Sequence, residues 1–215
     1  SESNVESAKQ QINLLETKLE NAKKDLEQTK DTTAKSIETA QADLEAKQQN
    51  LKDVKQTEQD NLKKAYENGR TALDTNYLPV NNARIELDNI QDDYFTTNDQ
   101  ISITVRDKFE KAESTLDEAE SLIDEANNTE DRTSTKNALN KLKEGSKELK
   151  EALRYTRDDA CEDPRYSYEI PASVKTTLDT QKSNVESAIS NLTTAQQNIE
   201  SQEISSQRKI NTAQS

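Results

Sequence analysis

The chain has 215 residues, a formal net charge of -13, 30% hydrophobic residues and 33% charged residues. Globular domains of this size usually contain about 45–50% apolar residues, so the composition excludes a single deep core. It leaves either a disordered chain or long helices with a narrow apolar stripe. Only two glycines and three prolines are present. Because disordered chains are usually rich in both residues and helix interiors exclude them, the composition favours helices.

The sequence contains no Met, even at position 1, so we expect a segment of a longer protein. No apolar run approaches the roughly 18 residues that a membrane-spanning helix needs, and no signal peptide is recognisable. In a segment, these two absences say nothing about the parent protein.

Residues 1–68 are predicted to form an outgoing coiled-coil arm. Their apolar residues recur at alternating steps of three and four, which is the spacing of a coiled-coil seam. The stripe consists of Val5, Ala8, Ile12, Leu15, Leu19, Ala22, Leu26, Ile37, Ala40, Leu44, Leu51, Val54 and Leu62. Steps of four near Thr33 and Glu58 indicate stutters, which locally unwind a supercoil.

Residues 69–198 are predicted to form an up-and-down four-helix bundle with short loops. Gly69 is expected to interrupt the helical pattern, and Pro79 can kink it. The four helices are expected at 70–95, 102–127, 133–160 and 173–198. Turns are expected at 96–99 and 127–129, and Ser173 is expected to cap the last helix.

The aromatic residues indicate where the chain is thickest. All eight lie between Tyr66 and Tyr168. Large aromatic side chains fill bundle cores, whereas two-stranded seams use aliphatic residues. The segment 162–172, with Pro164 and Pro171, is the least helical part of the pattern.

Residues 199–215 are predicted to be a return coiled-coil arm, antiparallel to the first arm because the bundle has an even number of helices. The return arm is too short to cover the outgoing one. Three explanations remain open: the return helix continues beyond this sequence, the first arm folds back near Thr32 and Thr33, or another chain supplies the partner. The predicted fold class is therefore all-α, an elongated antiparallel coiled-coil stalk leading into a four-helix bundle.

The sequence lacks the residues that most enzymes use. It contains no His, which removes the usual general base, zinc ligand and triad member. Two isolated glycines exclude a phosphate-binding loop. We therefore expect no enzymatic activity and no catalytic, cofactor-binding or metal-binding residues.

Weaker candidates for chemistry have simpler explanations. Asp74 to Asn76 begins like a calcium loop, but Pro79 stands where that loop requires Gly. The acidic pairs and runs at 92–93 and 158–163 are expected to be solvated helix ends. Cys161 lies among acidic residues, which raise a thiol pKa, so we expect a half-buried structural residue.

The charge also limits the partners. At a net charge of -13 the chain repels nucleic acid and anionic lipid. Its apolar faces are too narrow for a helix that lies in a membrane interface. Other proteins are therefore the expected partners.

Three stretches resemble a known family. They are Ala65 to Leu78, Ile90 to Gln100, and Ala160 to Thr180, which contains Ala-Cys-Glu before a Pro and Lys-Thr-Thr-Leu-Asp-Thr. Together they resemble the long helical insertion of bacterial membrane fusion proteins, the periplasmic adaptor subunits of secretion and efflux systems. In that family two halves of a lipoyl-like domain flank a helical hairpin, and the closing segment 209–214 would be the return to the second half.

This resemblance implies an extracytoplasmic location, in the periplasm or cell envelope, within a membrane-attached parent protein. It also implies contact with transporter or channel components, or self-association of the full-length protein. The chain differs from an ordinary adaptor in its enlarged middle.

Two other functions remain open. One is a ligand-sensing helical bundle of a bacterial receptor ectodomain, for which Arg84, Arg106, Arg154 and Arg157 are the candidate ligand contacts. Each of them is more often a surface residue that pairs with Asp or Glu. The other is a surface stalk or desiccation-type protein that is disordered alone.

Overall fold

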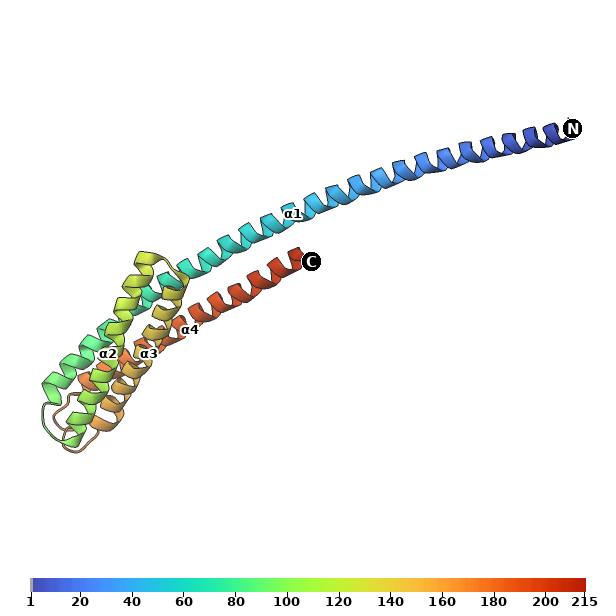
Figure 1. Cartoon of the computed structure of the whole chain (residues 1–215). Helices are drawn as coiled ribbons and strands as arrows, with labels where there is room; N and C mark the ends of the chain where they lie inside the picture. Colours follow the sequence, from blue (N-terminus) through green and yellow to red (C-terminus); the bar gives the residue numbers. More distant parts are fainter. Residues whose placement is uncertain (1) are drawn as a thin grey trace. The chain divides into compact units, whose positions relative to one another are not determined.

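The structure is a computed structural model that describes residues 2–215, and long helices make up most of it (Figure 1). The helices are α1 (Glu2–Tyr94), α2 (Gln100–Thr129), α3 (Arg132–Tyr155) and α4 (Ala172–Gln214). A π-helical turn, η1 (Thr156–Ala160), follows α3 directly. No β-strand occurs among residues 2–215, so the predicted all-α class is confirmed.

Helix α1 is one continuous helix of 93 residues. The predicted interruption at Gly69 is wrong, the helix also continues through Pro79, and the chain does not fold back near Thr32 and Thr33. A Pro in a helix interior removes one hydrogen bond and costs about 3 kcal/mol. Asn76 and Val80, on either side of Pro79, are both buried, and this packing keeps the segment helical.

The ends of the helices follow their capping residues. Asp99 caps α2, and its carboxylate accepts hydrogen bonds from the backbone N–H groups of Ile101 at 2.8 Å and Ser102 at 3.2 Å. The turn predicted at 96–99 is therefore confirmed. The expected cap at Ser173 is wrong, because α4 already begins at Ala172. The carbonyl of Pro171 accepts the N–H of Val174 at 3.0 Å, and a ring-fixed φ suits this helix start.

Helix α4 runs without a break to Gln214, so the predicted bundle helix 173–198 and the predicted return arm 199–215 lie in one continuous helix. The residues of helix α3 and turn η1 together match the predicted helix 133–160, with a change of hydrogen-bond pattern at Thr156.

Residues 2–215 divide into two compact units. The core unit is Thr57–Lys209, and the arm unit contains the residues up to Gln56 together with Ile210–Ser215. The segment limits predicted at 68/69 and 198/199 stay predictions.

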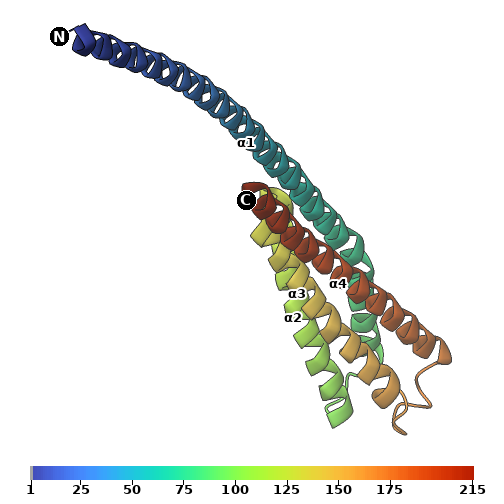
Figure 2. The same ribbon diagram turned by 90° about the vertical axis from the view of Figure 1, so that its right-hand side faces the viewer.

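One hydrophobic core holds the core unit together, and all four helices contribute to it (Figure 2). Leu87 of α1, Leu142 of α3 and Leu192 of α4 are 0% exposed, and Leu116 of α2 is 2% exposed. Each buried leucine contributes about 2 kcal/mol through its removal from water.

The aromatic residues only partly follow the prediction that they fill this core. Tyr66, Phe95, Phe109 and Tyr166 are buried, but Tyr168 is 94% exposed. The rings of Phe95 and Tyr166 pack with their centroids 4.9 Å apart and join the α1–α2 connection to the segment before α4.

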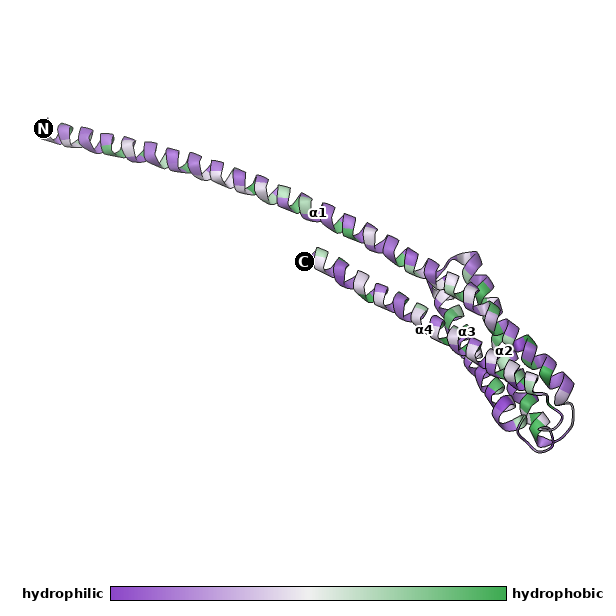
Figure 3. Ribbon diagram, turned by 180° about the vertical axis from the view of Figure 1, so that it is seen from behind, coloured by the Kyte–Doolittle hydropathy of each residue, from purple (hydrophilic) through white to green (hydrophobic). Residues whose placement is uncertain are grey.

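The arm unit has no such core. Every residue from Glu2 to Asn50 is exposed. Hydrophilic residues dominate this part of α1, with apolar residues scattered along it (Figure 3).

Candidate functional site

The first candidate surface is the heptad stripe of the arm unit. Seven of its large apolar residues are 53–63% exposed. They are Val5, Ile12, Leu15, Leu19, Leu26, Ile37 and Leu44. Apolar side chains at this spacing form a seam that a second amphipathic helix covers. Leu14, 56% exposed, lies beside the stripe rather than on it.

Hydroxyl residues bridge the weak part of the stripe between Leu26 and Ile37. The Thr29 hydroxyl donates to the Asp25 carbonyl at 2.8 Å, and the Ser36 hydroxyl donates to the Thr32 carbonyl at 2.9 Å. Their own helix therefore satisfies these hydroxyls, and a partner helix need not supply hydrogen bonds there.

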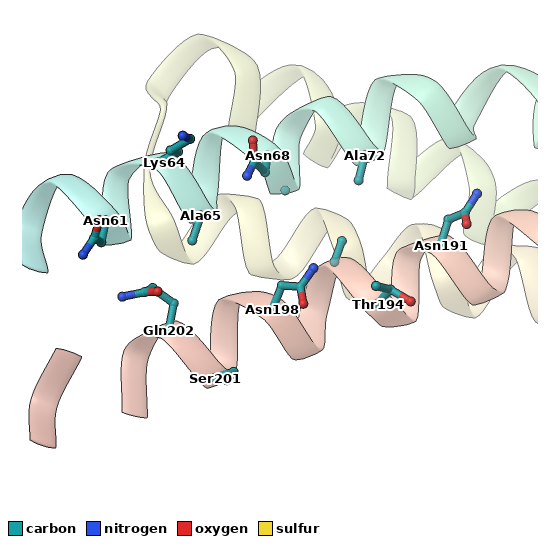
Figure 4. Close-up of a pocket in the computed structure, with 12 residues that line it drawn as sticks. Asn61, Lys64, Ala65, Asn68, Ala72, Asn191, Thr194, Asn198, Ser201 and Gln202 are labelled. Atoms are coloured by element: carbon teal, nitrogen blue, oxygen red, sulfur yellow. The ribbon is translucent and has the colours of Figure 1, made fainter. Parts of the chain in front are cut away.

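The second candidate surface is an open groove of about 580 Å³ between α1 and α4 of the core unit (Figure 4). Eleven of its twelve lining residues are uncharged, and Lys64 is the exception. Ala65 and Ala72 point from α1 toward α4, whereas Asn198 points from α4 toward α1.

A buried polar cluster joins α1 and α4 beyond this groove. Glu58 is 2% exposed. Its carboxylate accepts hydrogen bonds from Lys209 at 2.8 Å, Ser206 at 2.9 Å and Gln202 at 3.2 Å. The hydrogen bonds from Lys209 and Ser206 lower the Glu58 pKa. The sequence showed Glu58 only as an irregularity in the stripe, although a charge at a seam position is itself a signal of a polar contact.

Two more polar contacts continue the same interface. The amide of Asn191 donates to the side-chain oxygen of Asn76 at 3.0 Å. Glu203 accepts a hydrogen bond from Lys136 of α3 at 2.6 Å and another from the Tyr66 hydroxyl. Burial, and then the contact with Glu203, raises the pKa of Tyr66. These contacts fix the register of α4 against α1.

The four arginines of the receptor hypothesis do not converge. Arg84 pairs with Asp117 at 2.6 Å, Arg154 with Glu151 at 2.9 Å, and Arg157 with Asp179 at 3.1 Å. These three confirm the expectation of surface ion pairs. Arg106 does not, because it donates to the backbone carbonyls of Phe95 at 2.6 Å and Thr97 at 3.1 Å.

Several of the acidic candidates are engaged with protein groups. Asp159 and Glu162 pair with arginines, and Asp163 pairs with Arg165 at 2.9 Å. The Asp74 carboxylate accepts a hydrogen bond from Asn127 at 3.0 Å. In the part of the chain that the structure describes, no group of three or more His, Cys, Asp or Glu side chains is placed to hold a metal ion.

Cys161 is 0% exposed rather than half-buried. Burial raises the pKa of its thiol to about 11. The prediction of a raised pKa holds, but burial and not the acidic neighbours is its main cause. The thiol is therefore protonated at neutral pH and is a poor nucleophile.

A hydrogen-bonded cluster at the start of α2 was not predicted from the sequence. The Tyr166 hydroxyl lies 2.6 Å from the Ser102 hydroxyl and donates to the Asp99 carboxylate, which Thr97 also contacts. These contacts hold the pKa of Asp99 well below its usual range. Because Tyr166 lies 67 residues from Asp99, no local pattern predicts that Tyr166 joins this cluster.

Comparison of the chain with protein-family models, curated proteins and solved structures found no match. Across residues 2–215, none of the helices combines the length and apolar character needed to cross a membrane.

Proposed function

We propose that this chain is a structural interaction module, the extracytoplasmic α-helical hairpin of a membrane fusion (adaptor) protein in a transport or secretion system. In this proposal the arms form an antiparallel coiled-coil stalk and the core unit is an up-and-down four-helix bundle. The module has no enzymatic activity, and its partners are transporter or channel components or further copies of the full-length protein.

The exposed heptad stripe carries the proposal. Seven large apolar side chains of the stripe are more than half exposed, so they contribute little to the stability of a lone helix in water. Exposed apolar side chains at heptad spacing are typical of a seam that a partner helix covers. A second helix that covers the stripe would bury these side chains, at about 25 cal/mol for each Å² removed from water.

The contacts of the core unit support the bundle. Polar bonds join α1 to α4, ion pairs such as Arg84 with Asp117 join α1 to α2, and Lys150 pairs with Glu186 between α3 and α4 at 3.0 Å. Helices α2 and α3 make the remaining neighbouring pair, linked by Lys108 and Glu151 at 3.4 Å. Each helix thus contacts the next one around the core, as in an up-and-down bundle.

The resemblance to periplasmic adaptors supplies the proposed location and parent protein. Its three stretches lie in α1, in the α1–α2 connection, and between η1 and the first turns of α4. All three belong to the core unit.

A photo-crosslinking experiment in the parent protein tests the proposal. A photoreactive amino acid replaces Leu15 in one variant and Leu14 in a matched control. The two positions are neighbours of the same residue type, 63% and 56% exposed, but only Leu15 lies on the stripe. We expect crosslinks to a helical partner segment from position 15 and markedly fewer from position 14.

The same cells report the location. A protease added outside the inner membrane should cleave the module, whereas it should spare a cytoplasmic marker. Equal crosslinking at both positions would argue against a stripe-mediated contact, and protection from the protease would rule out the extracytoplasmic adaptor.

A further inference from the structure

One face of the core unit is nearly free of charge. Charged residues make up 33% of the chain, yet 75–83 in α1 and 187–199 in α4 contain none. These two runs lie side by side, since Asn191 donates to Asn76 at 3.0 Å. We name the surface formed by the groove lining and the adjoining exposed residues of these two uncharged runs the neutral face; Lys64 is the one charged residue of the groove lining.

The exposed positions of this face follow helical spacing. On α4 they include Ser187, Ser190, Asn191, Thr194, Asn198 and Ser201. Residues three and four apart lie on one side of a helix, so these hydroxyl and amide groups form a continuous row. A parallel row on α1 consists of exposed Lys64, Asn68, Thr75 and Asn82, with the half-buried Ala65, Ala72 and Pro79 between them.

The rest of the core unit is different. Helices α2 and α3 carry ion pairs on their surfaces, for example Lys111 with Glu148 at 2.9 Å and Lys141 with Glu118 at 3.0 Å. Glu186, the charge nearest the α4 row, pairs with Lys150 of α3 and thus lies on the side of α4 that faces α3. The lack of charge is therefore a property of the neutral face and not of the whole surface.

The neutral face is also shaped to receive a helix. Its groove of about 580 Å³ is floored by small residues, among them Ala65, Ala72 and Ala195. Small side chains let a second helix approach closely. Leu78, 61% exposed, adds a large apolar side chain within the same surface.

We propose that the neutral face is a contact between two copies of this chain, related by a two-fold axis. At a net charge of -13, two copies repel each other over most of their surfaces. Across the neutral face, where Lys64 is the one charged residue of the groove lining, they can meet with few like charges opposed and few charges buried. Depletion of charge is the compositional mark of interface cores.

The chemistry of the face makes it complementary to itself. Amides and hydroxyls both donate and accept hydrogen bonds, so identical rows can pair across a two-fold axis. A strongly charged partner would instead leave its charges without counterparts on this surface. The inference rests on the proposed function, since it names a partner for a protein that works through contacts, but it concerns a different surface from the stripe.

Charge substitution at Asn198 tests this contact. Sedimentation velocity across micromolar concentrations should show reversible dimers of the full chain. Asn198→Glu and Asn198→Lys should each weaken the association at least about tenfold, because like charges then face each other across the axis. A one-to-one mixture of the two variants should restore it, because opposite charges meet.

Ser121 of α2, also exposed and uncharged, provides the matched control. Ser121→Glu and Ser121→Lys should associate like the unaltered chain, and circular dichroism should show that all four variants are folded. A chain that stays monomeric throughout would overturn the proposal. Association that survives both Asn198 variants but is lost in Leu15→Lys would also overturn it, and would leave the stripe-based function standing.

Discussion

Glu58 places a carboxylate in the seam between two helices, where an apolar residue would be expected. Burying a charge is costly unless hydrogen bonds and a counter-charge compensate it. Lys209 supplies the counter-charge at 2.8 Å, and Ser206 and Gln202 donate further hydrogen bonds. A polar group at one seam position can specify the register of paired helices, and Glu58 has this role for α1 and α4.

The same contacts make the pairing sensitive to pH. They lower the Glu58 pKa in the folded protein below its ordinary value of 4.5. The stabilising effect is therefore complete above about pH 4.5 and is lost as the pH falls through the folded-state pKa. We expect Glu58→Gln to lower the midpoint of thermal unfolding at pH 7, and to lower it much less at pH 3.

A control separates this effect from general acid unfolding. Glu86→Gln changes an exposed carboxyl group of the same helix, and should lose as much stability on acidification as the unaltered chain. If Glu58→Gln and Glu86→Gln change the midpoint of thermal unfolding equally at both pH values, Glu58 does not stabilise the pairing of α1 with α4.

Glu130 is the one residue other than glycine with a positive φ among residues 2–215, at 53°. It follows the last turn of α2, and its N–H donates to the Ala126 carbonyl at 3.0 Å. This left-handed end of a helix suits glycine, since a side chain there costs about 1 kcal/mol. We expect Glu130→Gly to increase the free energy of unfolding by about 0.5–1 kcal/mol in urea titrations.

The neighbouring Thr129→Gly serves as the comparison. Thr129 is helical and its hydroxyl donates to the Glu125 carbonyl at 2.8 Å, so glycine there should destabilise by about 1 kcal/mol. Stabilisation by both substitutions, or by neither, would contradict the backbone explanation.

At the scale of the elements, Gly145 sets the distance between α2 and α3. A Cβ atom at this position would lie 2.7 Å from Leu116 Cδ2 and 3.3 Å from the Leu116 backbone nitrogen. Alanine is usually better than glycine inside a helix by about 1 kcal/mol. Here the overpacking should outweigh that gain, so we expect Gly145→Ala to destabilise by about 1–3 kcal/mol in urea titrations.

Asn137→Ala provides a control of opposite sign, because Asn137 is exposed on α3 and alanine has the higher helix propensity. A double variant tests the contact itself. If Leu116 is the obstacle, Gly145→Ala should cost less in the Leu116→Ala background than alone. Additive costs would mean that the two side chains do not compete for space.

Helix content and the positions of most apolar stripes were predictable from sequence, because both depend on local periodicity. Leu73, Leu87, Leu116 and Leu192 lie in the predicted bundle helices 70–95, 102–127 and 173–198 and are buried. The continuity of α1 through Pro79 was not predictable, since it depends on how Asn76 and Val80 pack against other helices.

The polar contacts between α1 and α4 could not be predicted from the sequence either. Glu58 and Lys209 are 151 residues apart, and Asn76 and Asn191 are 115 apart. Their pairing depends on the register of two helices, which periodicity alone does not give. Two of the three explanations for the unequal arms leave the stripe uncovered within this chain, and the third, a fold-back near Thr32 and Thr33, is wrong.

At the scale of the whole molecule, the two units differ in what stabilises their helices. In the core unit, side chains from four helices bury one another. In the arm unit, residues 2–50 are all exposed, so only hydrogen bonds along the helix and local side-chain contacts stabilise that stretch. Helices in proteins gain most of their stability from packing of an apolar face.

This difference predicts two phases of unfolding in dilute solution. The exposed part of α1 should lose helicity gradually at low temperature, and the core unit should melt cooperatively at a higher one, which far-ultraviolet circular dichroism would resolve. In hydrogen exchange, amides of 2–50 should exchange many times faster than those near Leu73 and Leu87. A partner helix that covers the stripe should slow amide exchange in residues 2–50 and raise the temperature of the first unfolding phase. Leu15→Lys should reduce this protection from exchange more than Leu14→Lys. One cooperative transition with uniform protection in the absence of a partner would show that the arm needs no covering helix.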